Sequence, residues 1–389
     1  MKVEDVSALL NSAASQMSDG VTLLENDLSN AVDFGRSIQN IYADDMRGYD
    51  LLLHKLPDQF NKIKTWAKPY ITYAPSVYME NETYGSIRAM YKTDYLPAVE
   101  ADMWNVQDGA DYSPDVVSLP DTRTTFWNGR FSSAVQHKTI FTEQWESAFQ
   151  TAQGLMEFVG MLEMARQNSH GRQWDNMIMT IFQALINMCF ESGGMKDIQL
   201  LTEYNTKHST SLTAAQAMEN QDFIRYAIYR MSIVRNQMRA LTSMFSRTGF
   251  LQQTPEDRQK VVYIADFASA AGVYLHDAPN QFNVGNLKIP NATTVPCWQG
   301  MGTAGDLADR MTVKGKITLQ VNGSMVTYTN TVPGVIGVVY DSVAMGISAY
   351  KHDITSHFIK RVHGTNYFDQ MMGGFFIDPD LNSVIFRLA

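Results

Sequence analysis

Residues 108–148 read DGADYSPDVVSLPDTRTTFWNGRFSSAVQHKTIFTEQWESA, an extended stretch that passes directly into a helix. From Asp108 to Lys138 there is no helical period, and turn residues are mixed with β-formers; Asn128–Gly129 is the strongest tight-turn signal. The segment has no core of its own, yet it is richer in aromatic and β-branched residues than disordered chains are. We therefore expect an extended arm that lies against another subunit.

The helix that follows begins near Thr142, a good N-cap residue with glutamates in the first turn after it. Glu163 and Arg166 would enter the apolar face, so we expect a bend or stop between Gln167 and Gly171. The apolar face consists of Trp145, Ala148, Phe149, Ala152, Leu155, Met156, Val159 and Leu162.

The composition restricts the class of protein. A chain of 389 residues can bury a large core in two or three domains. Its net charge of −9 disfavours nucleic acid or an anionic membrane as the main ligand, because phosphate binding needs clustered Lys and Arg. The two cysteines, Cys189 and Cys297, favour a reducing compartment. The first residues lack the apolar core of a signal peptide, and the most apolar stretch, residues 334–350, reads as a buried strand and turn.

Periodicity predicts helices in the first half of the chain and an α+β second half with antiparallel pairing. The strongest hairpin signal is Asn322–Gly323, between strands at 316–321 and 324–329. Gly193–Gly194 should end a helix. The other predicted helices are 6–17, 23–42, 174–189, 222–245 and 267–275, and the other predicted strands are 261–264, 335–340, 375–377 and 384–388.

Several patterns resemble chemical sites, and each has a simpler structural reading. The spaced glycines at 300–305 lack the flanking strand and the later acid of a dinucleotide site. Histidines at 352, 357 and 363, near Asp353, fit no zinc spacing, and we expect a surface or interface role. No nucleophile motif accompanies His276–Asp277, and no neighbouring sequence feature suggests that the Cys297 thiol is activated. We predict no catalytic residue, cofactor or metal. Four arginines on one helix face, Arg225, Arg235, Arg239 and Arg247, should be solvated or form intersubunit salt bridges.

Three stretches carry a family resemblance. Lys138–Ala148 looks like the passage from an extended loop into a spine helix, Gly334–Tyr350 like a late strand-and-turn segment, and Asn366–Phe368 followed by Gly373–Ile377 like a closing return strand. Their order over residues 66–389 resembles that of the major capsid proteins of tailed bacteriophages, particularly small podoviruses, which share their fold with encapsulin shell proteins. The resemblance is one of organisation and rests on no strict motif.

The resemblance implies the phage major capsid protein fold, in the α+β class, with an N-terminal helical arm (1–65), an extended β-hairpin loop (66–138), a peripheral domain with a spine helix (139–260), an axial domain (261–370) and a return strand (371–389). It also implies a structural protein of the virion, made in the host cytoplasm, whose pentamers and hexamers enclose double-stranded DNA without binding it specifically or contacting a membrane. Scaffold, portal and decoration proteins are further implied partners. Near the loop tip we expect intersubunit contacts from Asp121, Arg123, Trp127 and Arg130.

Three alternatives remain at this stage. An encapsulin-type compartment shell has the same fold and differs in its cargo. A soluble enzyme is weakened by the lack of a His, Asp, Glu and Ser cluster at catalytic spacing. Another virion component, such as a tail or connector protein, is the third.

Overall fold

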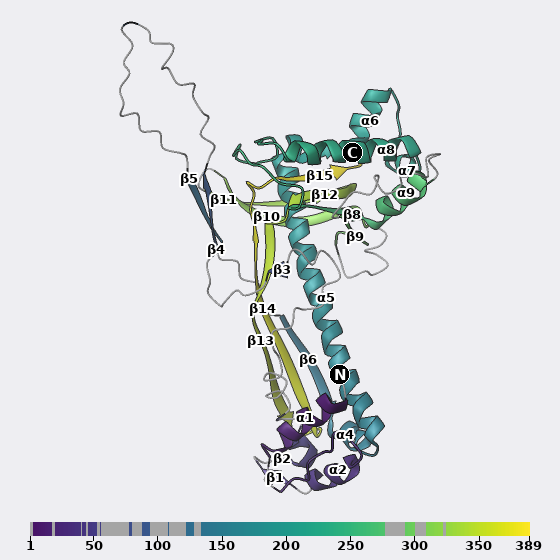
Figure 1. Cartoon of the computed structure of the whole chain (residues 1–389), viewed down its shortest axis with the longest axis vertical. Coiled ribbons are helices and arrows are strands. Elements are labelled where there is room, and N and C mark those ends of the chain that lie inside the picture. The colour runs from purple at the N-terminus through teal and green to yellow at the C-terminus, as the bar shows by residue number, and fades with distance from the viewer. Residues whose placement is uncertain are drawn as a thin grey trace. The chain divides into compact units, whose positions relative to one another are not determined.

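The protein is described here by a computed structural model, whose helices and strands are drawn in Figure 1. Its internal contacts define two compact units: unit 1 comprises Met1–Tyr84, Arg130–Ile178 and Ile347–Phe375, and unit 2 comprises Gly85–Gly129, Met179–Gly346 and Phe376–Ala389. The domain boundaries expected from the sequence stay a prediction. The structure describes residues 3–17, 20–39, 41–43, 46–52, 55, 78–79, 88–93, 108, 122–127, 134–276, 292–299, 309–321 and 324–389.

Two short helices, α1 (Val3–Ala14) and α2 (Ala31–Gln39), begin unit 1, followed by the paired strands β1 (Tyr42–Ala43) and β2 (Met46–Arg47). The prediction of helix from residue 23 is wrong up to residue 30. The Asn11 side chain accepts a hydrogen bond from Leu24 N at 2.6 Å and donates one to Leu24 O at 2.7 Å. The Asn11 amide therefore satisfies the backbone N–H and C=O of Leu24, which would otherwise form hydrogen bonds within a helix.

The next helices are α4 (Thr142–Ala148) and α5 (Ala152–Ser192), which has 41 residues. α4 begins near the predicted position, but its N-cap is Phe141 and not Thr142. The hydroxyl of Thr151 accepts a hydrogen bond from Gly154 N at 3.0 Å, so it caps the start of α5. The interruption between helices therefore lies at residues 149–151. At its other end α5 stops before Gly193, as predicted, and Gly193 has a positive φ of 60°.

The predicted bend between Gln167 and Gly171 is wrong, because α5 runs through it without a break. The polar side chains that interrupt the apolar face bond to one another along the helix. Arg166 Nε donates to Glu163 Oε2 at 2.8 Å, and Gln167 Nε2 donates to Glu163 Oε1 at 3.0 Å. Such pairs stabilise a helix surface, whereas a single interior glycine costs about 1 kcal/mol. Loss of the apolar face therefore did not mean loss of the helix.

Unit 1 contains a four-stranded sheet with the order β3 (Tyr78–Met79), β13 (Met345–Ile359), β14 (Gly364–Ile377) and β6 (Ala134–Phe141). Thr142, directly after β6, bonds through both its backbone N–H and its hydroxyl to the carbonyl of His363, at 3.0 and 2.8 Å. The start of α4 is thereby tied to the turn before β14. The core of the unit includes Val6, Leu9, Leu10, Leu28, Phe34, Ile38, Leu52, Ile140, Trp145, Phe149, Leu155 and Val159.

Unit 2 contains a five-stranded mixed sheet with the order β7-β15-β12-β8-β9. Its central strand β12 pairs antiparallel with β15 and β8, and all seven of its residues are buried. Helix α9 packs against β8 and α8, and α8 also contacts α6 and α7. The bounds are β7 Asp197–Gln199, α6 Leu200–His208, α7 Ala214–Met218, α8 Gln221–Met238, β8 Gln259–Ile264, α9 Ala265–His276, β9 Ala292–Val295, β12 Val335–Asp341 and β15 Ser383–Arg387, with a 3₁₀ turn at Gly194–Lys196.

Most predictions for the second half are confirmed. The strands expected at 261–264, 335–340 and 384–388 are β8, β12 and β15, and the helix expected at 267–275 is α9. The predicted hairpin is β10 (Val313–Val321) and β11 (Ser324–Val332), whose register places Val321 opposite Ser324. The expected short strand at 375–377 is instead the end of the long β14. The α+β class with antiparallel pairing is therefore confirmed.

Gly334 joins β11 to β12 in a conformation that only glycine adopts easily. Its φ is +69°, and an added Cβ would lie 2.7 Å from the carbonyl oxygen of Leu388. We expect Gly334→Ala to lower the free energy of unfolding by about 2–4 kcal/mol, because it adds both backbone strain and overpacking. Urea unfolding followed by circular dichroism measures this. Gly160→Ala is the control, since nothing lies near its added Cβ within α5; equal stabilities of the two variants would contradict the prediction.

Candidate functional site

One part of the arm predicted from the sequence, β5 (Thr122–Trp127), pairs with β4 (Arg88–Thr93) as a two-stranded antiparallel hairpin in unit 2. The end of the predicted arm, residues 134–138, is instead part of β6 in the sheet of unit 1. Of the predicted contact residues, Arg123 and Trp127 lie on β5, opposite Lys92 and Arg88 respectively. Asp121 and Arg130 lie outside the described residues. The predicted arm starts near Asp108, so the prediction did not include β4, the first strand of this hairpin.

Asn128 and Gly129, the predicted tight turn, also lie outside the described residues. The strands on either side of them do not pair with each other. β5 pairs with β4, whereas β6 pairs with β14 from Gly364↔Phe141 to Met371↔Ala134. The sequence signal at Asn128–Gly129 thus stands between two strands that belong to different sheets.

Lys92 attaches this hairpin to the chain segment after β14. Its ammonium Nζ lies 2.6 Å from Asp378 Oδ1 and 2.9 Å from Asp380 Oδ2. All three side chains are buried, with exposed fractions of 5% for Lys92, 0% for Asp378 and 10% for Asp380. Its neighbour Tyr91 is 76% exposed, as expected for alternation along a strand. We call Lys92, Asp378 and Asp380 the hairpin clamp.

The two aspartates of the clamp are fixed by the surrounding backbone and side chains. Asp380 N donates to Asp378 Oδ1 at 3.0 Å, and Asp378 N donates to Ala344 O at 2.7 Å. The hydroxyl of Thr248 donates to Asp380 Oδ1 at 2.7 Å, and Gln252 Nε2 donates to Asp380 O at 2.9 Å. These hydrogen bonds hold the two aspartates in place independently of Lys92.

Burial sets the electrostatics of the clamp. Desolvation raises the pKa of Asp378, although the hydrogen bond from Lys92 opposes that rise. Nearby, Lys196 donates to Pro379 O at 3.1 Å, and burial lowers the pKa of its ammonium. Removing one partner of such a buried pair typically costs about 3–5 kcal/mol, because the other charge is left without compensation. The clamp thus makes the hairpin depend on the C-terminal segment.

Sequence reasoning missed the clamp. Lys92 is 286 residues from Asp378 and 288 from Asp380. No local pattern marks a lysine on one strand and two aspartates flanking Pro379 as partners. Residues 88–93 read RAMYKT, which does not alternate between apolar and polar residues, and the pairing of β4 depends on topology.

The other residues that the sequence suggested as chemical sites lie in separate parts of the structure. His352 and His357 both lie on β13. His363 has a positive φ of 45°, and its Nδ1 lies 3.9 Å from Asp50 Oδ2. His276 ends α9, and Cys297 is buried. The glycines at 300–305 and Asp277 lie outside the described residues. In the described ranges, no cluster of His, Cys, Asp and Glu could hold a metal ion.

The expectation of four arginines on one helix face is wrong, because α8 ends at Met238. Arg235 is buried, and its Nε donates to Gln259 Oε1 at 3.1 Å. Arg225 and Arg239 are exposed and lie near Asp222 and Glu256, at 3.8 and 3.5 Å. Arg235 therefore forms a buried hydrogen bond between α8 and β8 inside unit 2. None of the helices in the described part of the chain has the length and apolar character to cross a membrane.

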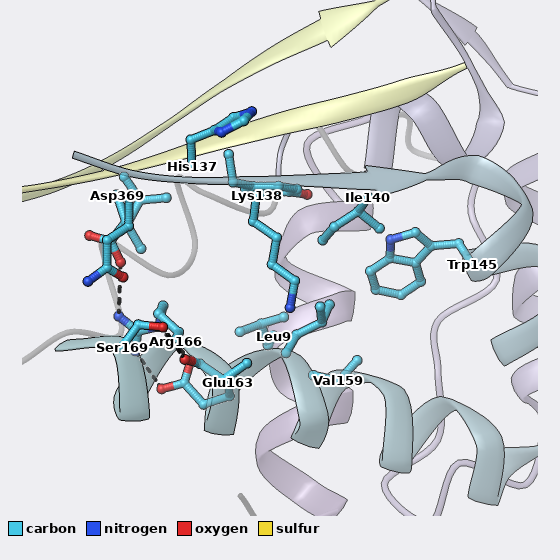
Figure 2. Close-up of a pocket in the computed structure, with 15 residues that line it drawn as sticks. Leu9, His137, Lys138, Ile140, Trp145, Val159, Glu163, Arg166, Ser169 and Asp369 are labelled. Carbon is cyan, nitrogen blue, oxygen red and sulfur yellow. Dashed lines mark hydrogen bonds and ion pairs between the residues drawn. The ribbon is translucent and has the colours of Figure 1, made fainter. Parts of the chain in front are cut away.

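Unit 1 holds a pocket of about 350 Å³ between its sheet and α5 (Figure 2). Strand β6 contributes Lys138 and Ile140, and α4 contributes Trp145. At one end of the pocket, Asp369 Oδ2 lies 2.5 Å from His170 Nε2. This contact joins β14 to α5 at that end of the pocket.

Comparison with known proteins gives a family and a fold. A family model described as Phi29-like phage major capsid protein matches residues 10–387. No curated protein matches the chain.

Two solved structures are similar in fold. The capsid structure of Staphylococcus phage Andhra is 10% identical with a TM-score of 0.53, over 80% of this chain and 83% of that one. The structure of the head fiber and inner core protein gp22 of native bacteriophage P68 contains a chain that is 9% identical with a TM-score of 0.50, over 84% of this chain and 87% of that one. At such low identity the likeness establishes the fold alone.

Proposed function

The chain belongs to the Phi29-like phage major capsid protein family, and we propose that its copies assemble as pentamers and hexamers into a phage head that encloses double-stranded DNA. The observation that carries this proposal is the family match over residues 10–387. The protein is thus a structural component of a phage capsid and not an enzyme. Pentamers, hexamers and the enclosed DNA are the parts of the proposal that need a test.

The β4–β5 hairpin is the element that we propose for contact between subunits. A two-stranded hairpin by itself is only marginally stable in water, so it needs further contacts. The clamp supplies one at Lys92, next to the last described pair of the strands, Thr93 and Thr122. Tyr91, the neighbour of Lys92 on β4, has an exposed ring. Addition of the arm to a neighbouring subunit would supply the tip with main-chain hydrogen bonds and buried apolar area.

Asp121, Arg123, Trp127 and Arg130 remain our proposed intersubunit contacts. The support for Arg123 and Trp127 is their place on β5. Arg123 is opposite Lys92 of the clamp, and Trp127 is at the other end of the strand, opposite Arg88. Aromatic and arginine side chains are the residue types that most often dominate binding at interfaces.

We also propose that α5 acts as the spine helix of the subunit. Its 41 residues contribute buried side chains to both units, for example Leu155 in unit 1 and Phe182 in unit 2. The assignment of peripheral and axial domains, the location in the virion after assembly in the host cytoplasm, and scaffold, portal and decoration partners are proposals that rest on the family alone.

The proposal predicts large assemblies of the purified protein. We expect negative-stain electron microscopy and light scattering after size-exclusion chromatography to show shells, tubes, or rings of five and six copies, each copy having a mass of 43.8 kDa. Rising protein concentration should increase the assembled fraction, because closed symmetry repeats each contact many times. A folded monomer or a small discrete dimer at every concentration would contradict the proposed function.

A further inference from the structure

The pocket of unit 1 has the size and the walls of a small-molecule site. Its volume of about 350 Å³ lies at the lower end of the range for ligand pockets. At about 30 Å³ for each water-sized group, it has room for on the order of ten non-hydrogen atoms. Its apolar wall consists of Leu9, Ile140, Trp145, Val159, Leu162 and Ile354, five of which are at most 5% exposed.

Two hydrogen-bond donors accompany the apolar wall. The indole nitrogen of Trp145 is buried and has no hydrogen-bond partner among the described residues, although a buried indole N–H normally has one. Figure 2 shows the Lys138 side chain extending from β6 into the space above α5, with its ammonium near Leu9 and Val159. Lys138 as a whole residue is exposed.

The acidic groups around the pocket already have cationic partners. Glu163 accepts from Arg166 Nε at 2.8 Å. Asp369 lies 2.5 Å from His170 Nε2 and 3.9 Å from Arg166 Nη1. By contrast, within the described ranges no carboxylate is paired with Lys138. His137, also on the lining, stacks on Phe368 with ring centroids 5.7 Å apart. The pocket therefore offers a bound molecule one uncompensated positive charge.

We propose that this pocket binds a small amphipathic anion, a carboxylate on a short alkyl chain. The apolar tail would lie against the apolar wall of the pocket, where it would replace water in a largely apolar space. The carboxylate would pair with Lys138 at the solvent-accessible side, and charge-assisted hydrogen bonds of this kind are stronger than neutral ones. The site is separate from the hairpin clamp and does not depend on shell assembly.

Isothermal titration calorimetry of the full chain with three probes tests the proposal. The probes are sodium octanoate, 1-octanol and octylammonium, which share an alkyl tail and differ in head-group charge. We expect octanoate to bind best, octanol more weakly and octylammonium weakest. Lys138→Gln should weaken octanoate binding about tenfold, the effect of one charge-assisted contact, and should change octanol binding less than twofold.

Two further variants complete the test. Lys316→Gln removes an exposed lysine from β10 in unit 2 and should leave octanoate binding unchanged. Ala165→Phe places a ring at the pocket wall and should abolish binding of octanoate and octanol, with circular dichroism as the check that the chain is folded. The proposal is overturned if octanoate does not bind, if octylammonium binds as well as octanoate, or if Lys138→Gln binds octanoate as the parent does.

Discussion

Replacing Lys92 by methionine is expected to lower the free energy of unfolding by about 3–5 kcal/mol. The variant keeps most of the side-chain volume but leaves Asp378 and Asp380 as two buried carboxyl groups without their cation. It also removes the described attachment of β4 to the C-terminal segment. Because an isolated hairpin is only marginally stable, the amides of β4 and β5 should be the first to lose their protection from hydrogen exchange.

Urea unfolding gives the change in stability, and hydrogen exchange of the β4 and β5 amides locates it. Lys316→Met is the matched control, because Lys316 is an exposed lysine on another hairpin of unit 2. Adding Asp378→Asn and Asp380→Asn to Lys92→Met should restore much of the lost stability, since replacing all members of a buried ionic group is far less costly than removing one. If Lys92→Met is as stable as Lys316→Met, the clamp does not hold the hairpin.

The free energy of unfolding of the Lys92→Met variant should depend on pH in a way that reflects the buried Asp378 of the clamp. Burial raises the pKa of Asp378 above its ordinary 3.8, and the contact with Lys92 is what limits that rise. Without Lys92 the pKa should rise further. A carboxyl with a higher pKa in the folded state binds more protons there, so stability falls as pH rises from the unfolded pKa through the folded one. The variant should therefore lose less stability near pH 4 than at pH 7, as measured by urea unfolding at both values.

Local patterns predicted those elements whose structure depends on near neighbours. The apolar run of β12 and the alternation of β10 and β11 around Asn322–Gly323 each carry their information within a few residues. The glycines after Ser192 end α5 for the same reason. Such features follow from burial and turn chemistry, so a single sequence is enough to find them.

Other failures have the opposite cause, because contacts between residues distant in the sequence decided them. Asn11 holds the backbone at Leu24, where the sequence predicts helix. The wrong bend in α5 is an exception, because Glu163 and Arg166 are only three residues apart and their pair merely supports a continuous helix surface. β5 found its partner in β4, across residues 94–121. The family could still be recognised, because the order of arm, long helix and late strands is preserved even where individual boundaries are wrong.

Shortening the arm while keeping its base should abolish shell assembly and leave the subunit folded. The register places Thr93 opposite Thr122 as the last pair of the described hairpin. Replacing residues 94–121 by Asn-Gly therefore creates a two-residue connection of the kind that suits antiparallel strands. The clamp is untouched, so the free energy of unfolding should change by no more than about 0.5 kcal/mol. Urea unfolding checks the fold, and negative-stain microscopy checks assembly.

A second variant separates the length of the arm from its sequence. A Gly/Ser segment of the same length, in place of residues 94–121, keeps the reach of the chain but removes its aromatic and β-branched side chains. If the arm binds a neighbouring subunit through those side chains and ordered main-chain contacts, this variant should also fail to assemble, whereas Lys316→Met should form shells. Assembly of the Asn-Gly variant into normal shells would show that subunits are joined elsewhere. Failure of both arm variants, with the clamp and the fold intact, would place the decisive contact in the segment between β4 and β5.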